Sequence, residues 1–380
     1  MTLRHALPLI AASLAALPLF VRAAVAEPPP QVGSPITHEN IAVYFLRGAS
    51  ASGPIPDTLQ EALAKGSVIV HETGEVQELK IENRGDRPVF VQFGDIVKGG
   101  QQDRVLTISM VLEPKSGLVP VGAYCVEQGR WAARGKEDVR RFAEAAELMP
   151  SREAKIAMAK PYTAKPADPA ANPPVRQGFV AGGINPPPLP RQQRLEELER
   201  FVQQRGPRGG DSQGEVWRSV GLVQQQLAGA LDAPVASDKS RTSLQLSLEN
   251  ERLQTARAAY LTAIEPAGLA GDDIIGVVFA VNGRVASADV YPSNGLFRKM
   301  WPKLARAAAT EALAKTKDTV ETAPSPQTVA ELLAAAAGGE KSEREIAGRT
   351  RIEARSTRES VQVETRSLTG QMVHRNYIAY

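Results

Sequence analysis

The chain has 380 residues and a formal net charge of +3, with 45 basic against 42 acidic side chains. This near balance gives no argument for a nucleic-acid-binding protein or for a protein attracted to an anionic membrane surface. Cys125 is the single cysteine, which excludes an intramolecular disulfide. Stability must therefore come from a buried core, and the chain is long enough to form one.

The N-terminus has the features of a secretory signal peptide. Arg4 precedes an apolar run over residues 6–21, and Ala24-Val-Ala26 offers the small residues that a signal peptidase recognises. We expect cleavage after Ala26, so that residues 1–26 are removed and residues 27–35 form a linker. The apolar run is short and interrupted for a membrane anchor, and no later segment is apolar enough to span a bilayer. The mature protein is therefore expected in the periplasm or outside the cell.

Residues 36–148 predict a β-rich part of the domain. Apolar and polar residues alternate, with turn residues roughly every eight to twelve positions, a pattern typical of antiparallel strands. The alternating segments are residues 67–72, 75–83, 89–93, 104–112 and 118–126. Residues 59–65 predict a short helix, and the composition of residues 130–147 favours a helix or a polar surface segment.

Residues 149–210 predict a flexible excursion from the domain. Prolines from Pro161 to Pro190 disfavour regular structure over most of this stretch, although residues 191–204 have an amphipathic helical pattern. A mobile linker is the expected role, and a proline-rich recognition ligand is the alternative.

Residues 211–380 predict the α/β part of the same domain. Residues 274–281 read as a buried strand, and Asn282-Gly283 favours a type I′ turn into a second strand over residues 284–291. The helical pattern over residues 296–315 contains Pro302, which fits only if a new helix begins near it. The other predicted elements are helices over 215–231, 250–264 and 328–337, and closing strands over 360–367 and 371–380.

The predicted elements together indicate an α+β fold. We expect mainly antiparallel β sheets with several packed helices, in a single discontinuous domain with a Pro-rich excursion. The 274–291 hairpin and the closing strands are too few to bury a face alone. We therefore expect them to join the N-terminal strands in shared sheets.

Two polar strings beside predicted strands form the candidate site, Gly99-Gly-Gln-Gln-Asp-Arg104 and Tyr124-Cys-Val-Glu-Gln-Gly-Arg-Trp131. Arg104 begins one strand and Cys125 ends the next, so an antiparallel pairing would bring Arg104 close to Glu127. A buried Arg104–Glu127 pair that holds the sheet together is the alternative to a ligand site. The residues expected to border one pocket are Gln101, Gln102, Asp103, Arg104, Cys125, Glu127 and Arg130, with His374 as a further candidate.

The chemistry of these strings has alternative interpretations. Cys125 shares a strand face with Glu127 and could be a nucleophile near an arginine, or it could simply pack in the core. Gly99-Gly100 could present backbone amides to an anion, or form a bulge or turn. The spacing fits no nucleotide-binding motif, and we expect no cofactor. The histidines lack metal spacing, so we expect no metal site. No nucleophile elbow is present to support Ser-His-Asp catalysis.

The same strings resemble the ARG and rhodanese-phosphatase-superfamily-associated protein domain. The resemblance rests on residues 94–105, 125–131, 275–284 and 296–304, and it covers most of the chain from about Ile36 to Tyr380. It implies one discontinuous α+β domain and marks the same candidate residues. It supplies no reaction.

The absence of a recognised catalytic motif favours a ligand- or partner-binding protein without catalysis. The alternative is a hydrolase or transferase that acts on a polar or anionic substrate through Arg104, Cys125 and Glu127. The expected partner is an unidentified small molecule or protein, and not a nucleic acid.

Overall fold

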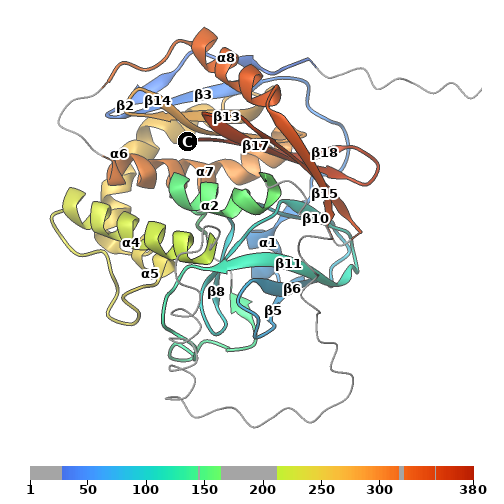
Figure 1. The fold of residues 1–380 in the computed structure, drawn as a ribbon, viewed down its shortest axis with the longest axis vertical. Helices are drawn as coiled ribbons and strands as arrows, with labels where there is room; N and C mark the ends of the chain where they lie inside the picture. Colours follow the sequence, from blue (N-terminus) through green and yellow to red (C-terminus); the bar gives the residue numbers. More distant parts are fainter. Residues whose placement is uncertain (1–27, 144–145, 164–211, 316–320, 347) are drawn as a thin grey trace, which may run out of the picture.

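A large antiparallel sheet forms one side of the molecule in the computed structural model (Figure 1). The structure describes residues 28–143, 146–163, 212–315, 321–346 and 348–380. The expected signal peptide and the helical pattern at 191–204 lie outside these ranges. The large sheet contains, in spatial order, β1 (Gln31–Val32), β3 (Ile41–Arg47), β13 (Ile274–Val281), β14 (Arg284–Val290), β18 (Met372–Ala379), β17 (Ser360–Ser367), β16 (Thr350–Ser356) and β15 (Glu340–Ile346), with β2 (Ile36–His38) beside β3.

Strands from distant parts of the chain meet in this sheet. β3 pairs with β13, and β14 pairs with β18, both antiparallel. The hairpin and the closing strands therefore share a sheet with N-terminal strands, as expected, but only with β1 to β3; the alternating segments over residues 67–126 form separate sheets. β1 pairs with β3 through Gln31 and Val32. The expected linker over residues 27–35 is thus wrong at these two positions, where the chain has already entered the sheet.

Two smaller sheets build the other half of the molecule. The first contains β12 (Phe142–Ala143), β8 (Ile96–Gly99), β9 (Arg104–Leu106), β11 (Gly117–Cys125), β6 (Glu78–Asn83) and β5 (Val68–Glu72). The second contains β10 (Met110–Leu112), β7 (Val89–Val91) and β4 (Asp57–Thr58). The fold is therefore α+β with mainly antiparallel sheets, as predicted.

The predicted strand over residues 104–112 is two strands, not one. β9 pairs with β11, whereas β10 leaves that sheet and pairs with β7. Ser109 lies at the change of direction, where its hydroxyl accepts the N–H of Phe93 at 2.9 Å. Residues 104–110 are buried on both faces, so one-sided alternation could not reveal where the strand breaks.

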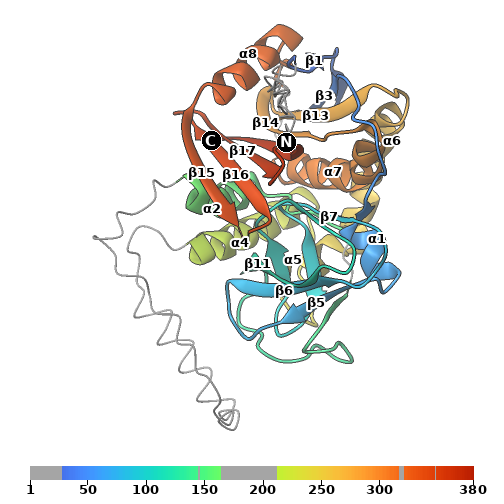
Figure 2. The same cartoon turned by 90° about the vertical axis from the view of Figure 1, so that its right-hand side faces the viewer.

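Helices cover both faces of the large sheet (Figure 2). α6 (Glu251–Gly268) and α7 (Asn294–Ala314) pack on one face, and α8 (Pro326–Ala337) packs on the other. α2 (Arg152–Thr163) and α4 (Ser212–Ala230) lie between the large sheet and the smaller sheets (Figure 1). The short helices α1 (Leu59–Ala64) and α5 (Leu244–Leu248) flank the smaller sheets.

Three helical expectations need correction. α2 begins inside the stretch expected as an excursion, because Ala154, Ala157 and Met158 bury one of its faces and Pro161 falls in its last turn. α7 runs through Pro302 without restarting, since buried side chains along it offset the lost hydrogen bond. Residues 130–143 form turns and β12 instead of a helix.

One cluster of buried apolar side chains contains residues from both halves of the chain, including Val43, Leu106, Phe279 and Ile378. The smaller sheets are thus packed against the same core as the large sheet. Among the described helices, none is both long enough and apolar enough to cross a membrane.

Candidate functional site

The two polar strings lie side by side because β9 and β11 pair antiparallel. Cys125 is the direct partner of Arg104 across this pair. Gly99 and Gly100 adopt positive φ values of 115° and 54°, and a Cβ on Gly100 would lie 2.3 Å from the ring of Phe142. The two glycines therefore make a tight turn between β8 and β9, as the turn alternative predicted.

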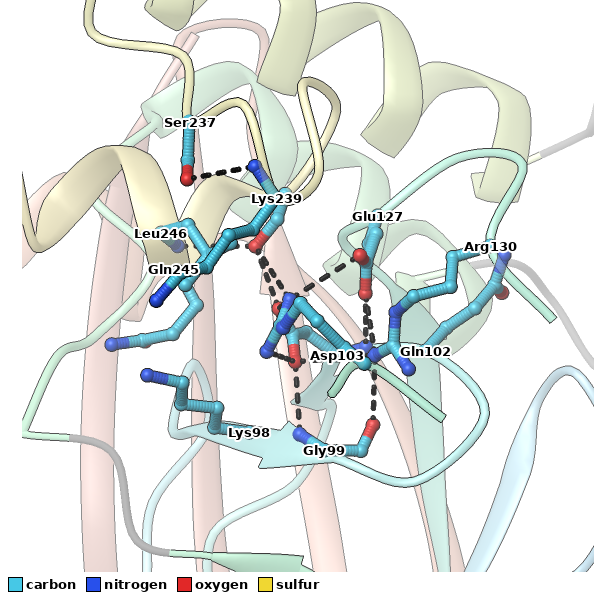
Figure 3. Close-up of polar contacts among 12 residues, drawn as sticks. Lys98, Gly99, Gln102, Asp103, Glu127, Arg130, Ser237, Lys239, Gln245 and Leu246 are labelled. Atoms are coloured by element: carbon cyan, nitrogen blue, oxygen red, sulfur yellow. Dashed lines mark hydrogen bonds and ion pairs between the residues drawn. The ribbon is translucent and has the colours of Figure 1, made fainter. Parts of the chain in front are cut away.

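Asp103 is the centre of a buried polar network between this turn and α5 (Figure 3). Arg134 donates from both terminal nitrogens to the two carboxylate oxygens, each at 3.0 Å. Ser243, the N-cap of α5, donates its hydroxyl at 2.7 Å, and the N–H of Gly99 donates at 2.9 Å. Asp103 is 0% exposed, so these contacts replace its hydration shell.

Glu127 is a second buried carboxylate beside Asp103. It forms ion pairs with Arg130 at 2.6 Å and with Arg134 at 3.3 Å, and it accepts the N–H of Asp103 at 3.0 Å. Burial disfavours the charged form of Arg134, but hydrogen bonds and charges from its carboxylate neighbours dominate and raise its pKa. The buried charges therefore stabilise each other's ionised forms.

Arg130 ties the two polar strings together. Its guanidinium donates to the carbonyl oxygens of Gly99 at 3.1 Å, Gly100 at 3.0 Å and Ala132 at 2.6 Å. The turn before β9 and the segment after β11 are thus held in one arrangement. Such fixed loops on a sheet are suited to ligand recognition.

Arg104 does not pair with Glu127, which corrects the expected contact. Its guanidinium pairs with Glu72 at 3.5 Å, donates to the carbonyl of Gln102 at 3.0 Å and lies 5.6 Å from the ring centre of Trp131. The strand pairing was predicted correctly, but Glu127 lies past the end of β11. It turns toward Arg130 and Arg134 instead.

Cys125 is buried in this sheet and held by α4. Its backbone N–H and carbonyl each bond the side-chain amide of Gln213 at 2.9 Å. Burial raises the pKa of the thiol to about 12, with Arg104 opposing and Glu72 and Glu127 adding to the shift. Because the thiolate is the nucleophilic form, this geometry supports the packed interpretation of Cys125.

His374 lies elsewhere, so the structure does not place it with the other candidates. Its Nδ1 lies 2.9 Å from the hydroxyl of Ser109, and its Nε2 lies 3.1 Å from Asp289, which also accepts Asn376 Nδ2 at 2.9 Å. The order serine, histidine, aspartate resembles a catalytic triad. All three residues are at most 3% exposed, and the adjoining cavity of about 10 Å³ is too small for a substrate. These contacts therefore join β18, β14 and the β9–β10 connection. We call Ser109, His374 and Asp289 the His374 clamp.

We call the connected residues the Asp103 cluster: Glu72, Gln101, Gln102, Asp103, Arg104, Glu127, Arg130, Trp131, Arg134, Glu137 and Ser243. Sequence reasoning missed Glu72, Arg134, Glu137 and Ser243 as members of the site. Arg134 and Glu137 lie within residues 130–147, which were interpreted as a helix or a polar surface segment. Ser243 is distant in sequence from Asp103, and no local pattern links the two residues.

Five buried polar atoms of the Asp103 cluster have no hydrogen-bond partner among the described residues: Gln101 Oε1, Gln102 Oε1, Arg104 Nε, Arg130 Nε and Glu137 Oε2. Gln101 and Arg130 are partly exposed, so the cluster reaches the surface. Within the described ranges, no group of three or more His, Cys, Asp or Glu residues is arranged to hold a metal ion.

A family model described as the ARG and Rhodanese-Phosphatase-superfamily-associated Protein domain matches residues 30–378. The matched range extends from β1 to β18 and includes the Asp103 cluster and the His374 clamp. Comparison with curated proteins and with solved structures found no match.

Proposed function

The chain belongs to the ARG and rhodanese-phosphatase-superfamily-associated protein domain family, and from this premise we propose that it binds a small polar ligand or partner at the Asp103 cluster without catalysis there. The proposal rests on buried polar atoms of Gln101, Gln102, Arg104 and Arg130 that have no hydrogen-bond partner in the part of the chain that the structure describes. A buried polar group left unpaired costs about 1–3 kcal/mol. A ligand that pairs with these atoms recovers that free energy.

The surrounding network supports recognition more than reaction. Asp103 and Glu127 are neutralised by Arg130 and Arg134, so neither is a free general base. The Cys125 thiol stays protonated near neutral pH because its pKa is raised to about 12. A hydrolase or transferase working through Arg104, Cys125 and Glu127 would need an ionised nucleophile that this arrangement disfavours.

We propose further that the protein is secreted or periplasmic, on the strength of the signal-peptide pattern before Glu27. Mass spectrometry of the exported protein tests this. A mature chain that begins at Glu27 is the expected result, and a cytoplasmic protein that retains residues 1–26 would contradict it.

Thermal-shift screening with polar ligands tests binding, because a ligand that prefers the native state raises the melting temperature. The informative variant is Gln101→Ala, which removes an unpaired amide oxygen and leaves the Gln101 backbone N–H free to bond Glu72. We expect near-normal melting without ligand and a reduced ligand-induced shift. The matched control is Gln371→Ala, at an exposed position beside β18, which should respond like the parent. Equal responses of both variants to every stabilising ligand would place the site elsewhere.

A further inference from the structure

The charges of the Asp103 cluster do not balance. Its carboxylates are Glu72, Asp103, Glu127 and Glu137, whereas its guanidiniums are Arg104, Arg130 and Arg134. The side chains of all but Glu137 are at most 11% exposed, and that of Glu137 is 26% exposed. Each carboxylate contacts an arginine, but the four carboxylates share three guanidiniums, so this partly buried site carries one more negative than positive charge.

Nearby lysines do not remove this excess. Lys98 is paired with Glu249 at 2.7 Å and forms a separate neutral pair. Lys239, which lies near Ser237 in Figure 3, is exposed, so solvent and salt weaken its charge. The negative excess thus remains with the cluster, and Glu137 is its most exposed carboxylate.

Unpaired atoms in the cluster point to the same ligand chemistry. Within the described ranges, the buried acceptors without a hydrogen-bond partner are Gln101 Oε1, Gln102 Oε1 and Glu137 Oε2, and the buried donors without one are Arg104 Nε and Arg130 Nε. A ligand with N–H donors and a neutral oxygen acceptor can satisfy both kinds of atom. Water can also form such hydrogen bonds, but it cannot supply the missing positive charge.

Building on the proposed function, we propose that the ligand of the Asp103 cluster is a primary ammonium compound that also carries a hydroxyl or another neutral oxygen. The ammonium group lies against Glu137 and donates to its free Oε2 and to the glutamine amide oxygens. The neutral oxygen accepts from the guanidinium Nε–H groups. A carboxylate or phosphate ligand would add to the negative excess and is disfavoured.

Three probes with the same four-carbon chain test this class: 4-amino-1-butanol, 1,4-butanediol and succinate. Each is titrated by calorimetry and by thermal shift at equal ionic strength. We expect the amino alcohol to bind and stabilise the protein, and the diol and the dicarboxylate to bind at least about tenfold more weakly, since a charge-assisted hydrogen bond contributes roughly this factor.

The variant that isolates the charge is Glu137→Gln, which keeps an oxygen to accept from Arg134 but removes the excess charge. Binding of the amino alcohol should weaken about tenfold, without loss of folding. Glu345→Gln on the exposed edge strand β15 makes the same charge change far from the cluster and should bind like the parent.

Each remaining outcome is decisive. Succinate or butanediol binding that Gln101→Ala weakens would overturn the ammonium assignment and leave the proposed binding site standing. Amino alcohol binding that Glu137→Gln and Glu345→Gln weaken equally would show a general charge effect and reject the assignment. If none of the probes binds, the assignment fails; if no ligand of the wider screen depends on Gln101 either, the proposed site fails with it.

Discussion

Glu127 shows at the scale of one residue how the cluster maintains its structure. It is 0% exposed and faces both Arg130 and Arg134. Glu127→Gln should lower the free energy of unfolding by about 3–5 kcal/mol, because it breaks the buried ion pairs of Glu127 with Arg130 and Arg134. Urea denaturation measures this change, with Asp238→Asn at a fully exposed ion pair as the control. An unchanged stability would show that the buried charges are not coupled as their distances indicate.

Cys125 makes the stability of the folded protein depend on pH. Burial raises the pKa of its thiol from 9.0 to about 12. The folded protein therefore retains a proton that the unfolded chain releases, and stability is lost as the pH rises from about 9 toward 12. The stability difference between the parent and Cys125→Ala should shrink over that window, as followed by urea unfolding at several pH values.

The same thiol should resist modification. Native protein treated with a thiol reagent at pH 8 should remain unmodified, whereas the urea-unfolded chain should react at once. Rapid modification of the folded protein would contradict the buried, protonated state and would favour the reactive interpretation of Cys125.

The His374 clamp belongs to the scale of elements, because it connects β18, β14 and the β9–β10 connection. Ser109→Ala removes the partner of the Phe93 N–H and of His374 Nδ1, and it should cost about 1–3 kcal/mol of stability. Ser287→Ala in β14 is the buried control. Hydrogen exchange should increase in β9 and β10 of the Ser109 variant. If protection from hydrogen exchange were lost in β18 alone, the β9–β10 connection would be held by packing and not by the Ser109 hydrogen bonds.

The turn between β13 and β14 shows why local elements could be predicted. Asn282 and Gly283 have positive φ values of 49° and 72°, as a type I′ turn requires. Gly283→Ala should destabilise the protein by more than about 1–2 kcal/mol, because it adds a contact of 2.7 Å with Glu321 to the left-handed strain. Gly370→Ala has the same left-handed strain, but its added Cβ would meet no atom within 4 Å. Thermal unfolding should therefore show a smaller loss of stability for this variant than for Gly283→Ala.

Elements without a local signal were missed. β15 has the sequence Glu-Lys-Ser-Glu-Arg-Glu-Ile and lies at the sheet edge with charged side chains outward. Charges of this kind protect an edge strand, and they also remove the apolar alternation by which strands are recognised. α2 was hidden because its alanines form a core face without large apolar residues.

The candidate site, like the fold, was predicted only where the sequence carries a local signal. The strings containing Asp103 and Glu127 were located because glycines, amides and charges cluster beside strands. The partners of Asp103 were not predicted, because Arg134 and Ser243 reach it only through tertiary packing. His374 was grouped with the cluster on residue type alone, and the structure places it with Ser109 and Asp289 instead.

At the scale of the whole molecule, the part of the chain before residue 164 and the part after residue 211 depend on each other. β3 lies inside the large sheet between β1 and β13, with Val43 0% exposed. α2 packs against α4 and against strands β15 to β18. A chain divided between these parts would leave β13 with an unpaired edge and α2 with an exposed apolar face.

Fragments 27–163 and 212–380 should therefore associate when they are expressed together. We expect them to elute as one species in size-exclusion chromatography, and each fragment alone to aggregate, because exposed sheet edges and apolar faces promote aggregation. Val43→Lys in the first fragment should abolish the association, since it places a charge in the shared core, whereas Glu75→Lys at an exposed position should not. Two folded, separately eluting fragments would show that the parts are independent domains and that the β3–β13 pairing contributes little to either of them.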